Sequence, residues 1–224
     1  MNKTSKADNE IKAVLFDLDG TILDTEKYFR KCWPAAFEHF GYSMSDQQAL
    51  SLRSLGRPFA PGILKEMSGD PDFDYEAVRS YRSKLMEETI EKNGLQLKAG
   101  CLEILDFLKE RGIVRAVATA SPQDRSERYL KKAGILEYFD RVISATMVKE
   151  GKPSPDIYLY ACEQLGFAPE DCIAVEDSPN GVLSASRAGC KTVFIPDQTP
   201  PTAEDLRMCF AVKESLDQIK ELFE

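Results

Sequence analysis

The feature that most constrains the fold is an alternation of short apolar runs with helix-like segments that end at glycine. Six runs rich in apolar and β-branched residues are expected to form strands: residues 12–17, 113–119, 141–145, 172–175, 191–195 and 209–212. Intervening segments with apolar residues at helical spacing stop at Gly112, Gly134, Gly166 and Gly189, and glycine commonly ends a helix. This alternation predicts a doubly wound, Rossmann-like α/β fold with a parallel sheet covered on both faces.

One long stretch interrupts the alternation. Residues 24–96, between the first and second expected strands, carry helix signals only. Aromatic and apolar side chains recur there every three or four residues from Tyr28 to Phe40, which is the spacing of one helix face. We therefore predict an α/β core made of residues 1–23 and 97–224, and an inserted all-helical cap domain made of residues 24–96.

The charge balance narrows the classes of partner. The 224 residues include 29 Lys and Arg against 37 Asp and Glu, a formal net charge of −8. Such a chain is a poor candidate for binding nucleic acid or an anionic membrane, and no apolar run approaches the roughly 18 residues of a membrane span. The polar first ten residues do not resemble a secretory signal. We expect a cytoplasmic protein, with a monomer as the default.

The six cysteines are scattered along the chain and form no C-x-x-C pair. Most of them lie beside apolar residues in expected strands or helices. This pattern predicts buried free thiols in a reducing compartment, and it disfavours a disulfide framework or a zinc site.

Chemically active side chains follow four of the expected strands. They are Asp17 and Asp19 after the first strand, Thr119 at the end of the second, Lys152 after the third, and Glu176 and Asp177 after the fourth. Ligands of open parallel sheets bind at the carboxyl ends of the strands. Four carboxylates gathered there raise one another's pKa unless a cation neutralises them. An oxygen-only cluster without His or Cys favours a hard cation, Mg²⁺ before Zn²⁺.

These groups are suited to phosphoryl transfer. A metal-bound carboxylate can attack phosphorus and form an aspartyl phosphate. The metal and the Lys152 ammonium would offset the repulsion between this carboxylate and the phosphate, and the Thr119 hydroxyl can donate to a phosphoryl oxygen. A second carboxylate two residues on can protonate the leaving alkoxide and then deprotonate the attacking water.

Four motifs, in order, resemble those of the haloacid dehalogenase-like phosphatase superfamily. They are Asp17-Leu-Asp19-Gly-Thr21, Thr119, Gly151-Lys152-Pro153-x-Pro155-Asp156 and Glu176-Asp177-Ser178-x-x-Gly181. Asp-Gly alone would also fit a solvated turn, whereas four motifs in order are specific. The resemblance covers nearly the whole chain, including a helical cap after the first motif, and the most similar subgroup is the beta-phosphoglucomutase-like one.

The resemblance implies a role for each matched residue. Asp17 would be the nucleophile and Asp19 the general acid/base. Mg²⁺ would be held by the Asp17 carboxylate, the Asp19 main-chain oxygen and Asp177, with Glu176 beside it or in its shell. Thr119 and Lys152 would bind the phosphoryl group.

Neighbouring residues complete the predicted site. Ala120 and Ser121 follow Thr119 and are expected near the phosphate, although Ser121 is favoured as the N-cap of a helix that begins at Pro122. Arg57 lies in a cap turn at a position where related mutases keep a phosphate-contacting arginine, so it is a candidate for substrate contact.

Two aromatic positions bear on the type of reaction and on the cap. Mutases of this family carry a histidine at the position of Phe29, and the single histidine of this chain, His39, lies about ten residues further on and is expected to be structural. Trp33 and the aromatic stripe around it are expected in the cap core rather than at the substrate.

The predicted function is a Mg²⁺-dependent phosphatase that hydrolyses a small phosphorylated metabolite, with a sugar phosphate favoured, through an aspartyl phosphate. The alternative is a beta-phosphoglucomutase-type sugar phosphate mutase, an isomerase that uses the same phosphoaspartate. A signalling receiver domain is disfavoured, because receivers are much shorter and keep the phosphorylated Asp after a middle strand.

Overall fold

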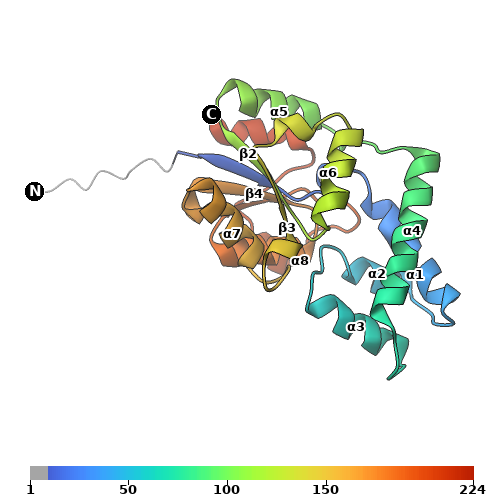
Figure 1. Cartoon of the computed structure of the whole chain (residues 1–224). Helices are drawn as coiled ribbons and strands as arrows, with labels where there is room; N and C mark the ends of the chain where they lie inside the picture. The colour runs from blue at the N-terminus through green and yellow to red at the C-terminus, as the bar shows by residue number, and fades with distance from the viewer. Residues whose placement is uncertain (1–9) are drawn as a thin grey trace, which may run out of the picture.

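The computed structural model describes residues 10–224, and a parallel sheet forms its centre (Figure 1). In spatial order the strands are β3 (Arg141–Ser144), β2 (Val114–Thr119), β1 (Ala13–Phe16), β4 (Cys172–Glu176), β5 (Lys191–Phe194) and β6 (Ala211–Val212). Each strand pairs in parallel with its neighbours. The strand order reverses between β1 and β4, which makes their carboxyl ends the switch point of the sheet. The predicted doubly wound α/β fold is confirmed.

Helices cover both faces of this sheet. One face packs against α5 (Cys101–Glu110), α6 (Gln123–Lys132) and the 3-10 segment η4 (Leu216–Phe223), and the other against α7 (Asp156–Leu165) and α8 (Pro179–Ala188). Side chains of β1 alternate between the two, with Phe16 in the first apolar cluster and Leu15 in the second. Because helices cover both faces of the sheet, the sequence of each strand is a nearly continuous run of apolar residues. The α/β part also contains α9 (Ala203–Met208) beside α8 and the short 3-10 turns η1 (Leu136–Tyr138), η2 (Ala145–Met147) and η3 (Pro169–Asp171).

Four helices lie between β1 and α5, beyond one end of the sheet (Figure 1). They are α1 (Glu26–His39), α2 (Asp46–Ser51), α3 (Phe59–Ser68) and α4 (Tyr75–Asn93). Helix α1 packs along α4. Helix α2 begins with a capping box in which the Ser45 hydroxyl accepts from the Gln48 amide at 3.2 Å and the Gln48 side chain accepts from the Ser45 amide at 2.7 Å. This arrangement satisfies two backbone donors at the start of the helix.

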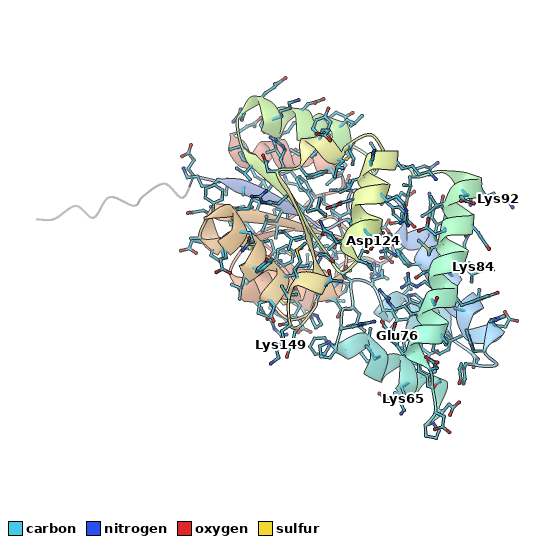
Figure 2. All side chains as sticks on the ribbon, in the orientation of Figure 1. Lys65, Glu76, Lys84, Lys92, Asp124 and Lys149 are labelled. Carbon is cyan, nitrogen blue, oxygen red and sulfur yellow. The ribbon has the colours of Figure 1, made fainter. Side chains whose placement is uncertain are left out.

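Helix α4 has one buried face and one charged face. Its buried residues are Val78, Arg82, Met86 and Ile90, spaced four residues apart. Glu76, Lys84 and Lys92 are exposed and point outward from the same helix (Figure 2). A buried arginine within an otherwise apolar stripe is unusual, and it becomes important for the site.

Two linkers connect these helices to the sheet. Leu23 forms an antiparallel bridge with Leu97. The Asp24 amide donates to the Gln96 carbonyl at 2.9 Å, and the Lys98 amide donates to the Ile22 carbonyl at 2.8 Å. The chain thus leaves and re-enters the α/β part at adjacent points. These contacts lie where the sequence places the boundaries of the cap, and the division into two domains stays a prediction.

Other expectations about the chain have mixed outcomes. The free thiols are confirmed, because five cysteines are buried, Cys209 is partly buried, and none of the six forms a disulfide. The last strand is shorter than expected, and α9 and η4 were not predicted. Within residues 10–224, no helix is both long and apolar enough to cross a membrane. The prediction about a secretory signal concerns residues 1–10, of which residues 1–9 lie outside the described residues.

Candidate active site

Three buried carboxylates meet at the switch point of the sheet. Asp17 directly follows β1, while Glu176 ends β4 and Asp177 follows it. Each offers one oxygen, and the three oxygens lie within 4.8 Å of one another. One oxygen of each side chain, namely Asp17 Oδ2, Glu176 Oε2 and Asp177 Oδ2, has no hydrogen-bond partner among the described residues. Buried charged oxygens are costly unless something neutralises them, so this cluster fits a divalent cation.

Two glycines allow these carboxylates to pack against the backbone. A Cβ placed on Gly181 would lie 1.9 Å from Glu176 Oε2, and one placed on Gly20 would lie 2.4 Å from Asp177 Oδ2. Gly20 also has a φ of +91°, which disfavours other residues. Ser178 is the N-cap of α8, as the sequence predicts, and its hydroxyl accepts from the Gly181 amide at 3.3 Å.

Lys152 lies between two of the acids and is fully buried. Its ammonium contacts Asp17 Oδ1 at 2.5 Å, Glu176 Oε1 at 2.6 Å and the Ala118 carbonyl at 2.8 Å. Three acceptors use all three of its donors. The ammonium therefore offsets the charge of the carboxylates directly, and a role in phosphoryl binding stays a prediction. The Tyr158 hydroxyl donates to Glu176 Oε1 at 2.5 Å, a support that the motifs do not reveal.

Burial perturbs the acids of this cluster. It raises the pKa of Asp17 to about 8, an effect that Lys152 opposes and Glu176 reinforces. Burial, followed by the charges of Glu26 and Asp17, raises the pKa of Asp177 well above its ordinary value. Burial alone would lower the pKa of Lys152, but Asp17 and Glu176 hold it above its usual range. Burial therefore disfavours the ionised form of Asp17 and Asp177, and a bound cation would favour it.

The Asp19 carboxylate is oriented by a different set of groups. Its Oδ1 accepts from the Thr25 hydroxyl at 2.7 Å, and its Oδ2 accepts from the Ser121 hydroxyl at 2.5 Å and from Arg125 at 2.9 Å. The prediction that Ser121 caps the next helix is wrong: Pro122 is the N-cap of α6. The Ser121 hydroxyl binds Asp19 instead, and its amide donates to Thr119 Oγ1 at 3.1 Å.

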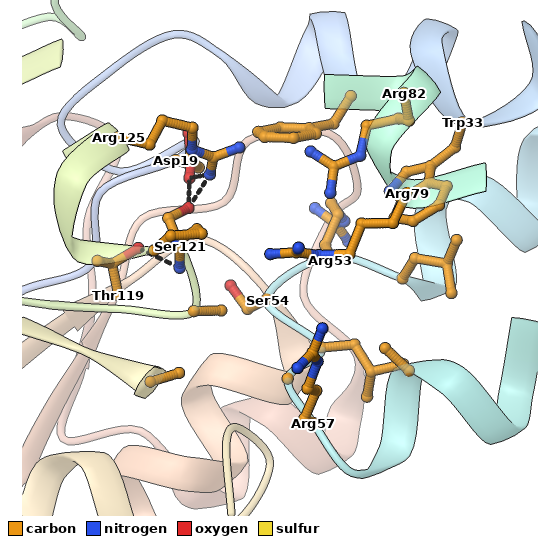
Figure 3. A pocket seen from close by; sticks show the side chains of 18 of the residues that line it. Asp19, Trp33, Arg53, Ser54, Arg57, Arg79, Arg82, Thr119, Ser121 and Arg125 are labelled. Atoms are coloured by element: carbon orange, nitrogen blue, oxygen red, sulfur yellow. Dashed lines mark hydrogen bonds and ion pairs between the residues drawn. The ribbon is translucent and has the colours of Figure 1, made fainter. Parts of the chain in front are cut away.

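A cavity of about 530 Å³ opens above these residues, between the sheet and the cap helices (Figure 3). The predicted residues that line it are Asp17, Asp19, Thr119, Ala120, Ser121 and Arg57. The structure thus brings both catalytic candidates, three candidate phosphate ligands and the cap arginine to one space. Glu176, Asp177 and Lys152 are fully buried next to Asp17.

The cap wall of the cavity is rich in arginine. Arg53, Arg57, Arg79 and Arg82 line it from the cap side, and Arg125 lines it from α6 (Figure 3). Arg57 is largely exposed, pairs with Glu76 and lies 5.6 Å from the centre of the Tyr75 ring. Only Arg57 was predicted. The sequence signal for Arg82 was its place in the apolar stripe of α4.

The aromatic residues of α1 contribute to the same wall. Phe29 and Trp33 both line the cavity, and the Arg82 guanidinium lies 4.9 Å from the Phe29 ring and 4.6 Å from the Trp33 ring. Both aromatics are buried, as expected for the cap core, but they also face the ligand space. His39 is exposed and stacks on Tyr81 at 3.8 Å between ring centres, which agrees with a structural role.

Comparisons with known proteins agree with the motifs. Residues 11–189 match the haloacid dehalogenase-like hydrolase family. The chain is 30% identical over 189 residues to a phosphorylated carbohydrates phosphatase of Thermotoga maritima, covering 82% of this chain and 84% of that protein. It is 33% identical over 208 residues to hexitol phosphatase A of Escherichia coli, covering 93% of each. A beta-phosphoglucomutase structure from Clostridium difficile superposes with a TM-score of 0.81 at 25% identity, covering 95% of this chain and 97% of the other. The chain therefore belongs to the haloacid dehalogenase-like hydrolases.

Proposed function

We propose that this protein is a Mg²⁺-dependent phosphatase that hydrolyses a small phosphorylated carbohydrate or a related metabolite. The observation that carries the proposal is Asp17 Oδ2, a buried carboxylate oxygen without a hydrogen-bond partner in the described chain, on a residue that lines the cavity. The chain is a phosphoric monoester hydrolase, in agreement with relatives that are named phosphatases of phosphorylated carbohydrates and of fructose 1-phosphate.

Asp17 is the nucleophile of this reaction. Its Oδ2 attacks phosphorus and forms an acyl phosphate, while the ester P–O bond breaks and the alkoxide leaves. Lys152 fixes the other oxygen of Asp17, which leaves Oδ2 available for attack. Thr119, Ala120 and Ser121 line the cavity beside Asp17. The Thr119 hydroxyl binds a phosphoryl oxygen, since the hydroxyl and the amide of Ser121 already donate to Asp19 and Thr119.

Asp19 moves the protons. It donates a proton to the leaving alkoxide in the first step and accepts one from the attacking water in the second. The water oxygen bonds to phosphorus, the bond between phosphorus and Asp17 breaks, and inorganic phosphate is released. The hydroxyls of Thr25 and Ser121 hold the carboxylate of Asp19 in place.

The metal site fits the acidic cluster. Asp17, Glu176 and Asp177 would supply the side-chain oxygens, and the main-chain oxygen of Asp19 would be the fourth ligand. When bound, Mg²⁺ supplies charge neutralisation for the nucleophile and for the phosphoryl oxygens. The unpartnered oxygens of all three acids support this assignment.

Hydrolysis is favoured over mutase chemistry by Phe29. The position at which related mutases carry a histidine lines the cavity here, but a phenylalanine side chain can neither donate nor accept a proton. This wall of the cavity therefore has no side chain at position 29 that could take the proton from a sugar hydroxyl during transfer of the phosphoryl group to it. Water is the acceptor of the phosphoryl group instead.

The first experiment measures Mg²⁺-dependent release of inorganic phosphate from a panel of phosphorylated metabolites and from p-nitrophenyl phosphate. We expect Asp17→Asn to abolish turnover, because the amide is a poor nucleophile, and Asp19→Asn to reduce it severely. Asp124→Asn, an exposed residue in the first turn of α6, is the matched control and retains activity. Full activity of Asp17→Asn would refute the mechanism.

A second experiment separates hydrolysis from isomerisation. The protein is supplied with a hexose 1-phosphate and a bisphosphate primer, and both products are measured. We expect inorganic phosphate to accumulate without the isomeric sugar phosphate. Accumulation of the isomer would assign the chain to the mutases.

A further inference from the structure

Arg125 contacts the Asp19 carboxylate from a position outside the four motifs. It lies in the first turn of α6, and its Nη2 donates to Asp19 Oδ2 at 2.9 Å and to the Ser121 hydroxyl oxygen. The three side chains meet at the cavity (Figure 3). Within residues 10–224, Arg125 is the one cation that forms an ion pair with Asp19. An arginine therefore contacts the side chain to which the proposed reaction assigns the proton transfers.

The contact with Ser121 also fixes the direction of the serine proton. A hydroxyl has one proton to donate, and its oxygen can accept at the same time. The Ser121 oxygen accepts from Arg125, and its proton is directed at Asp19 Oδ2, 2.5 Å away. The Thr25 hydroxyl donates to the other oxygen, Oδ1, at 2.7 Å. Both oxygens of Asp19 are thus held, and Arg125 acts on one of them directly and through Ser121.

Aromatic rings confine the guanidinium of Arg125. It lies 5.0 Å from the centre of the Phe29 ring on α1 and 5.6 Å from that of the Tyr129 ring on α6. A cation over an aromatic face within about 6 Å is attracted to it. The side chain of Arg125 is only 11% exposed. Its donor is therefore preorganised toward Asp19 before any ligand binds.

Asp19 needs such a partner because other acids lie close to it. Asp17 is two residues away, and the buried Glu26 of α1 lines the same cavity. Burial, followed by the charge of Asp19, raises the pKa of Glu26, which shows that these two carboxylates repel each other. Repulsion favours side-chain orientations that separate like charges. The ion pair with Arg125 opposes such a movement of Asp19.

We propose that Arg125 is a positioning residue: directly and through Ser121, it holds Asp19 in the orientation in which that carboxylate transfers protons. In the second step the attacking water gives a proton to Asp19, its oxygen bonds to phosphorus, and the bond between phosphorus and Asp17 breaks. A misplaced Asp19 slows this transfer while Asp17 keeps its own contacts. The inference rests on the proposed phosphatase function and adds to it a residue that the motifs omit.

Kinetics with p-nitrophenyl phosphate separate positioning from a general loss of structure. Its leaving group is a weakly basic phenolate that departs without a proton, so kcat/KM, which extends to formation of the acyl phosphate, does not depend on Asp19. In contrast, kcat includes hydrolysis of the acyl phosphate, which does. We expect Arg125→Gln to lower kcat by about tenfold to a hundredfold, the size of effect for displacements near 1 Å. We expect kcat/KM to stay within about threefold of the wild type, so that KM falls with kcat.

An alkyl ester provides the complementary measurement. The alkoxide that leaves from fructose 1-phosphate must be protonated, so Asp19 acts in both steps. For this ester we expect Arg125→Gln to lower kcat/KM as well as kcat. Arg207→Gln, which changes an exposed arginine of α9, is the matched control and retains the wild-type constants for both esters.

A double-mutant cycle tests whether Arg125 acts through Asp19. Adding Arg125→Gln to Asp19→Asn should leave kcat unchanged, because the proton-transfer group whose orientation it sets is already lost. Arg125→Lys keeps a cation at this position and should restore part of kcat. This variant also keeps the cycle measurable if Arg125→Gln fails to fold.

Two results would overturn the positioning role. A parallel loss of kcat and kcat/KM for p-nitrophenyl phosphate would show a structural role, and effects that multiply in the double variant would show a direct contact with the substrate. In both cases the wild type still releases phosphate, and the phosphatase function stands. A wild type that releases no phosphate from any ester would instead refute the phosphatase function itself.

Discussion

Asp177 in the acidic cluster lowers the stability of the folded protein when it is ionised without a cation. Asp177 is fully buried, one of its oxygens lacks a partner, and its pKa is raised. A carboxyl whose pKa is raised by folding binds more protons in the native state than in the unfolded state. Its contribution to stability is therefore complete below the ordinary pKa of 3.8 and is lost as the pH rises toward the folded value.

Replacement of Asp177 by Asn should remove this penalty. In metal-free protein we expect Asp177→Asn to be more stable than the wild type at pH 8, with the difference shrinking as the pH falls toward 4. Mg²⁺ should stabilise the wild type, by about 2.7 kcal/mol at a hundred times its dissociation constant, and have little effect on the variant. Urea unfolding of the two proteins at several pH values, with and without Mg²⁺, measures the pH-dependent difference in stability and the stabilisation by Mg²⁺. A difference between the two proteins that is constant from pH 4 to 8 would contradict the assignment.

Among the helices, α8 contains a glycine that the site requires. Gly→Ala inside a helix normally stabilises by about 0.5–1 kcal/mol, because glycine loses more backbone entropy on folding. At Gly181 the new Cβ would collide with the Glu176 carboxylate, which Lys152 and Tyr158 hold in place. The usual gain is therefore reversed at this position.

Gly62 in α3 provides the comparison, since a Cβ there would meet nothing within 4 Å. We expect Gly181→Ala to lower the free energy of unfolding by roughly 1–3 kcal/mol, the range for overpacked sites, and Gly62→Ala to raise it by about 0.5–1 kcal/mol. Chemical denaturation of the two variants measures the difference. Stabilisation of both would show that Glu176 can move away at little cost.

The elements also show what the sequence could and could not predict. Strands β1 to β5 and the four glycine-terminated helices were predictable, because covered strands and helix stops have local signals. Asp17, Asp19 and Thr119 were located because they lie at or just after the ends of such strands. The cap arginines other than Arg57 were missed because they reach the cavity from separate segments, and only the break in the apolar stripe at Arg82 marks one of them. Helix α9 is six residues long, which is too short for a periodic pattern.

On the scale of the whole molecule, the cap contacts the core beside Lys152. The Gly56 amide donates to the Lys152 carbonyl at 2.9 Å, and the Gly151 amide donates to the Arg57 carbonyl at 2.6 Å. The Asn180 side chain donates to the Arg53 carbonyl at 2.9 Å. The segment that carries two cap arginines is therefore docked on the loop that carries Lys152. The position of the cap and the geometry of the reaction centre are linked through this contact.

The close approach of Gly56 to Gly151 makes the link between cap position and reaction centre testable. A Cβ on Gly56 would lie 2.7 Å from the Gly151 Cα, and backbone on both sides prevents an easy adjustment. Gly56→Ala should therefore separate the cap from the core and lower kcat/KM for phosphate release by about tenfold to a hundredfold, because displacements near 1 Å have effects of that size.

Trp33, the single tryptophan, lines the cavity, so its fluorescence during ligand titration reports the position of the cap. Gly62→Ala again serves as the control. Wild-type kinetics and an unchanged Trp33 titration in Gly56→Ala would show that catalysis does not depend on this docking contact.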